Sequence, residues 1–99
     1  MLNNIYKFNI KDFLKKDFAH NPEDGINIAN KILNEAINSK KIEIDFKGIN
    51  TANTAFCNML FAELKKASKT YEIKLINCND LIIETFSRVK DNYDKGDIK

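Results

Sequence analysis

Side chains that donate and accept hydrogen bonds are concentrated in one short stretch of the chain. Asn50, Thr51, Asn53 and Thr54 lie within residues 50–54. Such side chains bind the free backbone amides at the start of a helix. A hydroxyl in a first helical turn also lies beside the positive end of the helix dipole, where a phosphate group is well accommodated. Two interpretations of Thr54 therefore stay open: part of a helix cap, or a site of phosphorylation.

The other reactive side chains lack the neighbours that catalysis requires. His20 is the only histidine, and it lies in a polar segment beside an asparagine and a proline. Cys57 lies in the most apolar segment of the chain, which favours inert packing. Nothing near Cys78 in sequence lowers the pKa of its thiol. Because no base accompanies Thr54 or Cys57 as a nucleophile, we expect a protein that is not an enzyme.

Signatures of cofactor and metal sites are missing from the sequence. The chain has three glycines and no glycine-rich loop of the kind that binds phosphate groups. Glu43, Asp45 and Asp80 do not form a recognisable set of metal ligands, since a hard cation needs several converging oxygens. We therefore expect no cofactor and no metal ion.

The composition predicts one small domain with a modest core. The chain has 99 residues, of which 43% are hydrophobic, and a net charge of only +2. This balance, together with a single arginine at Arg88, argues against a nucleic-acid partner. No apolar run approaches the roughly 20 residues that span a membrane, and no signal peptide is evident. We expect a cytoplasmic protein with reduced thiols and no membrane partner.

Hydrophobic periodicity predicts three strands that alternate with three helices. Apolar and polar residues alternate in the expected strands, which cover residues 4–10, 41–47 and 71–78. Apolar residues recur at helical spacing in the expected helices, which cover residues 25–38, residues 54–67 and residues 80–93. The middle helix is apolar almost all round at its start, so we expect it to be buried on more than one side.

The segment before the first long helix is less clear. Residues 11–24 fit either a short helical turn or a loop held by aromatic side chains. Asn21 or Asp24 is expected to cap the helix that follows, and Asn79 or Asp80 the last helix.

Alternating strands and helices predict an α/β fold with right-handed crossovers. Strands buried on both faces read as continuous apolar runs, whereas these strands alternate. We therefore expect a small, mainly parallel or mixed sheet with helices packed mostly on one face. The expected open face carries Glu43, Asp45, Lys47, Glu72 and Lys74. One domain should cover residues 1–93, with residues 94–99 as a frayed tail. The open face and an exposed first strand would permit a homodimer.

One stretch, IEIDFKGINTANTAFCNMLFAELKKA, resembles the STAS domain of bacterial anti-sigma factor antagonists. It is most similar to the STAS-like branch of small bacterial proteins with unassigned function. The run from Asp45 to Ile49 (DFKGI) matches the strand motif of that branch. Thr54-Ala55-Phe56 matches the segment that opens the next helix. The resemblance extends over residues 25–93 and implies a STAS-like fold.

The resemblance also implies a regulatory switch. In the antagonists, a partner kinase of the GHKL ATPase fold phosphorylates a serine in an Asp-Ser-Ser/Thr-Gly run at a helix start. The unphosphorylated form binds that kinase and releases a sigma factor. The resemblance places Thr54 at the phosphorylated position. Asn53 replaces the acid, which removes a group that orients the hydroxyl, and Phe56 replaces the glycine and is expected to crowd the approach of a kinase.

The function implied is therefore that of a non-catalytic module that binds a GHKL-type ATPase or another signalling protein. The expected contacts are Asn50, Thr51, Asn53, Thr54 and Asn58, together with the last helix. A self-associating scaffold and a small ligand-binding protein remain as alternatives. A small enzyme that uses Thr54 or Cys57 is the least favoured interpretation.

Overall fold

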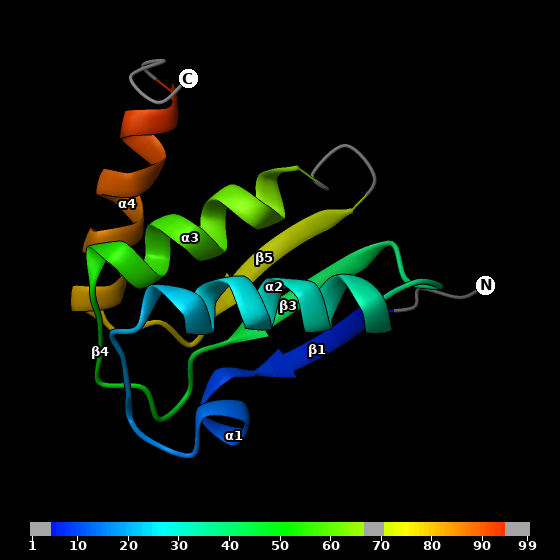
Figure 1. Cartoon of the computed structure of the whole chain (residues 1–99), viewed down its shortest axis with the longest axis horizontal. Helices are drawn as coiled ribbons and strands as arrows, with labels where there is room; N and C mark the ends of the chain where they lie inside the picture. The colour runs from blue at the N-terminus through cyan, green and yellow to red at the C-terminus, as the bar shows by residue number, and fades with distance from the viewer. Residues whose placement is uncertain (1–4, 67–70, 95–99) are drawn as a thin grey trace.

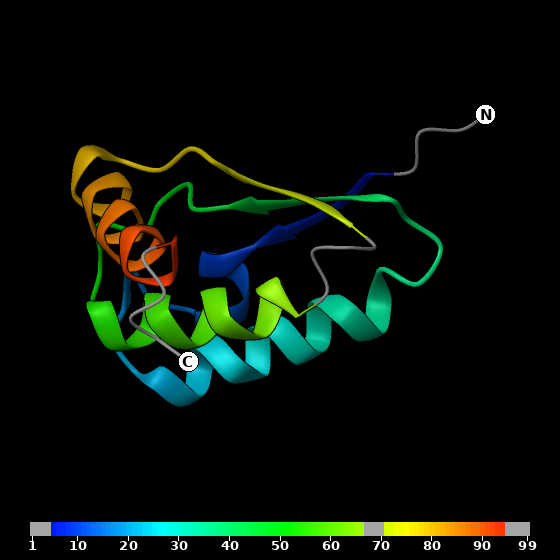
Figure 2. The same cartoon turned by 90° about the horizontal axis from the view of Figure 1, so that it is seen from above.

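A three-stranded parallel sheet forms one layer of the molecule (Figure 1). The computed structural model describes the backbone of residues 5–66 and 71–94, and the side chains in these ranges up to residue 90. The strands are β1 (Ile5–Asn9), β3 (Lys41–Asp45) and β5 (Glu72–Ile76), in the spatial order β1-β3-β5. The described helices lie on one face of this sheet (Figure 2). The predicted α/β fold, with helices on one face, is confirmed.

The alternating pattern of the strands separates a core face from an open face. Phe8, Ile44 and Leu75 are aligned across the three strands and point toward the helices. On the opposite face, Glu43 lies between exposed lysines of the two outer strands. Lys47 was predicted on that face but lies beyond the end of β3. The chain has already turned there, because the Ile49 amide donates to the Phe46 carbonyl over 2.9 Å.

Helix α2 (Pro22–Glu35) begins earlier and ends earlier than its apolar pattern predicts. Asn21 is the cap rather than Asp24: its side-chain oxygen accepts from the Glu23 amide over 2.9 Å. Proline in the first helical position has the required φ angle and needs no amide partner. At the other end the backbone leaves the helix at Ala36 to turn toward β3. Ile37 therefore lies in this turn and is 72% exposed, although its spacing places it on the buried stripe.

Helix α3 (Thr54–Lys65) packs against α2, and the two backbones lie close together at Gly25. A β-carbon on Gly25 would lie 2.7 Å from the Phe56 carbonyl oxygen and 3.0 Å from the Leu60 nitrogen. Helices in contact are normally 8–10 Å apart, and a glycine lets the two backbones approach closely. Predicted burial of α3 on more than one side is confirmed, since it also contacts α4 (Asp80–Asp94).

Residues 11–24 contain a helical turn and one strand of a second, very small sheet. Helix α1 (Ile10–Leu14) is capped by Asn9, which accepts from the Asp12 amide over 2.8 Å. Strand β2 (Phe18–Ala19) then pairs in parallel with β4 (Thr51–Ala52). The sequence did not predict this pairing, because a two-residue strand is too short to show a period.

The last helix, α4, is capped by Asn79, whose side-chain oxygen accepts from the Ile82 amide over 2.9 Å. Ile82, Phe86 and Val89 are buried as predicted, and the Phe86 ring packs edge-on against a core phenylalanine. Ile83 was predicted on the buried stripe but is 51% exposed, since successive helical residues differ by about 100°.

Two predictions for the C-terminus fall partly beyond the structure. The side chain of Tyr93 and residues 95–99 lie outside the described residues. Asp94, predicted to belong to the frayed tail, ends α4. In the described part of the chain, no helix has the length and apolar character needed to cross a membrane.

Candidate interaction site at the strand-to-helix corner

The carboxyl ends of parallel strands meet at one edge of the sheet, and three chain segments converge there. These segments are the loop around β2, the segment that leads through β4 into α3, and the connection from β5 to α4 (Figure 1). All five residues predicted as partner contacts lie on the segment that contains β4 and the start of α3. We call the surface around this segment the corner.

Asn53 caps α3 and joins it to the β2 loop. Its side-chain oxygen accepts from the Phe56 amide over 2.9 Å, and its side-chain nitrogen donates to the His20 carbonyl over 2.9 Å. Its own amide donates to the Ala19 carbonyl over 3.0 Å. Asn53 is exposed, but its hydrogen-bonding groups are bound within the fold.

Asn50 has a similar role on the other side of β4. Its amide donates to the Asp17 carbonyl over 2.7 Å, and its side chain donates to the Asp17 carboxylate over 3.1 Å. The Asn50 carbonyl in turn accepts from the Asn79 side chain over 2.8 Å. Asn50 and Asn53 thus connect all three segments of the corner, and both side chains stabilise the loops directly.

Thr54 and Asn58 differ from these two asparagines. Thr54 is the first residue of α3 and is exposed, while the capping oxygen comes from Asn53. Asn58 is half-buried and lies four positions further on, so it shares a helix face with Thr54. The exposed Ala55 lies between them in sequence. The first two turns of α3 therefore present a small polar surface with a hydroxyl at its edge.

Comparison with known proteins identifies the family. The family model of the STAS-like domain of unknown function (DUF4325) matches residues 24–82, more than half of the chain. The chain belongs to this family. The matched region runs from the start of α2 into α4 and contains the corner from β4 onward. No curated protein and no solved structure gave a significant match.

The capping asparagine of this STAS-like domain can be tested against its threonine neighbour. Asn53→Ala removes both the cap of α3 and the bond to the β2 loop. We expect it to lower the free energy of unfolding by about 1 kcal/mol or more. Thr54→Ala should change it by less than about 0.5 kcal/mol, as for an exposed site. Urea unfolding followed by circular dichroism measures both, and equal losses would contradict the assignment of the cap.

Asp45 ends β3 beneath the corner and is held by hydrogen bonds from three sides. Its carboxylate accepts from the Asn77 side chain over 2.9 Å and from the Lys47 amide over 2.8 Å. Partial burial raises the pKa of Asp45, but these bonds and one from Asn9 together outweigh it and leave the pKa below its ordinary value of 3.8. Asn77 reaches Asp45 from a left-handed backbone conformation, with φ of 58°.

The lowered pKa of Asp45 predicts how stability depends on pH. Because the pKa is lower in the folded domain, Asp45 stabilises the fold above pH 3.8, and this contribution is lost as the pH falls through the folded pKa. Asp45→Asn keeps an acceptor oxygen but cannot titrate. We expect its free energy of unfolding to decline less steeply in acid than that of the wild type. Asp12→Asn, at an exposed aspartate of α1, is the control, and parallel acid curves for Asp45→Asn and wild type would contradict the prediction.

A histidine and a hydroxyl meet at the corner of this STAS-like domain, although they are far apart in sequence. The His20 Nε2 atom lies 2.9 Å from the Thr51 Oγ1 atom, and the His20 ring packs beside Phe18 with centroids 5.2 Å apart. A ring nitrogen next to a hydroxyl is an arrangement suited to proton transfer. The same bond also links the residue that follows β2 to β4, which accounts for its position. Sequence analysis missed it because it depends on the unpredicted β2–β4 pairing.

The two cysteines are poor nucleophiles at neutral pH. Cys57 is fully buried, and this burial, with a smaller effect of Cys78, raises the pKa of its thiol to about 12. Burial and the charge of Asp45 also raise the pKa of Cys78. Within the described ranges, no three His, Cys, Asp or Glu side chains are grouped so as to hold a metal ion.

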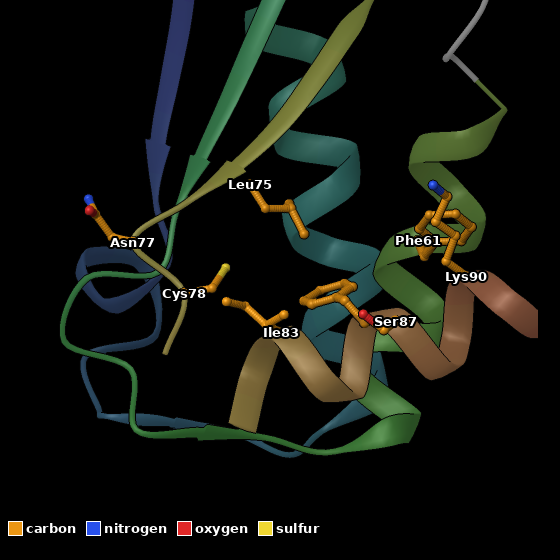
Figure 3. Close-up of a pocket in the computed structure, with 8 residues that line it drawn as sticks. Phe61, Leu75, Asn77, Cys78, Ile83, Ser87 and Lys90 are labelled. Atoms are coloured by element: carbon orange, nitrogen blue, oxygen red, sulfur yellow. The ribbon is translucent and has the colours of Figure 1, made fainter. Parts of the chain in front are cut away.

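A groove next to the corner separates β5 from α3 and α4. It contains a cavity of about 410 Å³, in which Leu75, Cys78 and Ile83 point inward and Asn77 points away (Figure 3). A second cavity of about 330 Å³ continues along β5 and shares Phe61, Leu75 and Phe86 with the first. The groove is mainly apolar and follows the outer edge of the sheet.

Proposed function

We propose that this STAS-like domain is a non-catalytic regulatory module that binds a signalling protein through the start of α3, and that phosphorylation of Thr54 weakens this binding. One observation carries the proposal: Thr54 is exposed at the first position of the helix, while Asn53 supplies the cap. A modification of Thr54 would therefore leave the contacts of the cap in place and alter only the surface.

The surroundings of Thr54 suit an added phosphate. The first backbone amides of a helix lack partners within the helix and lie at the positive end of its dipole. The first turn of α3 contains no acidic residue that would repel the phosphate. The phosphate would add up to two negative charges to a helical turn that has none, which is sufficient to repel a partner that binds the neutral form.

The partner we propose is a GHKL-type ATPase, as in the anti-sigma factor antagonists that this family resembles. Of the two departures from their motif, Asn53 retains a capping oxygen. Phe56 is fully buried, so its ring does not crowd the surface of Thr54 as the sequence alone led us to expect. The buried, protonated thiol of Cys57 supports a non-catalytic function.

Photo-crosslinking from the corner tests the proposal. With p-benzoylphenylalanine at the exposed Ala55, we expect one ATPase-type signalling protein to be captured in the native cell. Thr54→Val, which removes the hydroxyl but keeps the shape, should retain the crosslink, and Thr54→Glu should lose it. Asn30→Glu, on the exposed face of α2, adds the same charge elsewhere and should have no effect. Equal crosslinking by Thr54→Glu and wild type would refute the switch.

A further inference from the structure

The outer edge of β5 has free backbone groups. In the described part of the chain, β5 pairs with β3 on one side only. The Glu72 amide donates to the Lys40 carbonyl over 2.8 Å, and the Ile76 carbonyl accepts from the Phe46 amide over 2.9 Å. The backbone groups of Glu72 and Ile76 therefore point toward β3. Because alternate residues of a parallel strand point their amides and carbonyls to opposite sides, those of Ile73 and Leu75 point outward. Such an edge is a template for another strand.

Charges alternate in sign across the open face as far as this edge. In one row, Lys7, Glu43 and Lys74 are aligned across β1, β3 and β5. In the next row, Lys41 of β3 is aligned with Glu72. Opposite charges on neighbouring strands stabilise a sheet, whereas like charges destabilise it. β5 therefore presents one acid and one base at its outer edge, two residues apart.

We propose that two copies of this chain pair through β5, antiparallel, about a two-fold axis that passes between the two Ile73 residues. In two antiparallel strands related by such an axis, each residue lies opposite a partner residue whose side chain is on the same face of the sheet. The axis must therefore pass through a residue position. Centred on Glu72 or on Lys74, the pairing places like charges opposite each other. Centred on Ile73, it places Glu72 opposite the partner's Lys74, twice.

The same register pairs apolar side chains on the helix face. Ile73 lies opposite the partner's Ile73, and Leu75 lies opposite the partner's Tyr71. Leu75 lines the cavity of about 410 Å³ beside α4, so the partner's tyrosine ring is placed where the groove is open. A continuous six-stranded sheet results, in which the alternation of charge continues across the interface.

The other free edge lacks this complementarity. β1 carries a single charged residue, Lys7, with Ile5 and Asn9 on the same face. A register centred on Lys7 places two lysines opposite each other, and registers centred on its neighbours place each lysine opposite an uncharged side chain. Of the two edges, β5 is therefore the one that fits a second copy.

Cysteine crosslinking tests the register. In a background with Cys57→Ala and Cys78→Ala, Ile73→Cys places two thiols at the axis, where opposite residues have Cα atoms about 5.5 Å apart, within the range of a disulfide. We expect it to form a disulfide-linked dimer under dissolved oxygen. Leu75→Cys is the control, because the two copies of residue 75 are then about 14 Å apart, too far for a disulfide. Crosslinking through Leu75→Cys instead of Ile73→Cys would overturn the register.

Light scattering with charge reversal tests the interface itself. Wild type is expected to have twice the 11.4 kDa mass of the chain. Lys74→Glu places acids opposite each other and should raise the dissociation constant at least tenfold. Lys7→Glu is the matched control, since Lys7 also lies beside Glu43 but on β1, away from the interface. It should leave the dissociation constant unchanged. A monomer at every concentration, or equal effects of the two variants, would refute the proposal.

Discussion

Phe56→Ala is expected to lower the free energy of unfolding by about 3–5 kcal/mol. The Phe56 side chain is fully buried within the core between the helices and the sheet. Its removal loses the transfer free energy of a phenyl ring and leaves a cavity that rigid neighbours fill only in part. Since small domains are stable by only about 5–15 kcal/mol, the variant should be close to unfolding at room temperature.

The matched control for this variant is Phe18→Ala. Phe18 is 41% exposed on β2. Its side chain therefore buries far less apolar area than that of Phe56, and its removal creates no closed cavity. We expect a loss of about 1 kcal/mol. Urea unfolding at pH 7 measures both variants. If Phe56→Ala cost no more than Phe18→Ala, the side chain of Phe56 would not be in the core, and the explanation for the accessible surface of Thr54 would fail.

Gly25→Ala is expected to destabilise the domain by about 1–3 kcal/mol. Alanine in place of glycine within an exposed helix normally stabilises by about 1 kcal/mol, so the expected sign is reversed. The cause is the contact of α2 with α3, where the new methyl group would lie 2.7 Å from the Phe56 carbonyl oxygen. That oxygen belongs to the backbone of a packed helix and moves only if the helices separate.

Asn27→Ala distinguishes this steric effect from helix propensity. Asn27 is exposed on the same helix, and alanine there should be neutral or slightly stabilising. Thermal unfolding followed by circular dichroism compares the two variants. A Gly25→Ala domain that melts at or above the wild-type temperature would contradict the close packing of α2 and α3.

Regular periods made most of the fold predictable. Alternation in Ile42, Ile44 and Phe46 predicted β3 with one buried face, and this is the central strand of the sheet. The predictions were wrong where the apolar spacing of a helix continues in the sequence beyond the end of the helix, or includes a residue next to the buried face. Ile37 continues the apolar spacing of α2, yet the backbone has already turned toward β3. Ile83 follows the buried Ile82 directly and points into the groove instead.

The candidate site was predictable in position but only partly in the roles of its residues. Asn, Thr and Gly between a strand and a helix indicate a corner with a cap. Which side chain provides the cap depends on backbone geometry, and the structure selects Asn53. The side chains of Asn50 and Thr51 find side-chain partners 33 and 31 positions away, in a loop without a periodic pattern. No local signal in the sequence could have assigned them.

The affinity of the captured partner for Thr54 variants tests the central claim most directly. Purified partner and purified domain are titrated by calorimetry at neutral pH. We predict equal affinities for wild type and Thr54→Val, and at least tenfold weaker binding for Thr54→Glu, equivalent to about 1.4 kcal/mol. Equal binding by all three proteins, or Thr54→Val as weak as Thr54→Glu, would contradict a switch operated by charge at the start of α3.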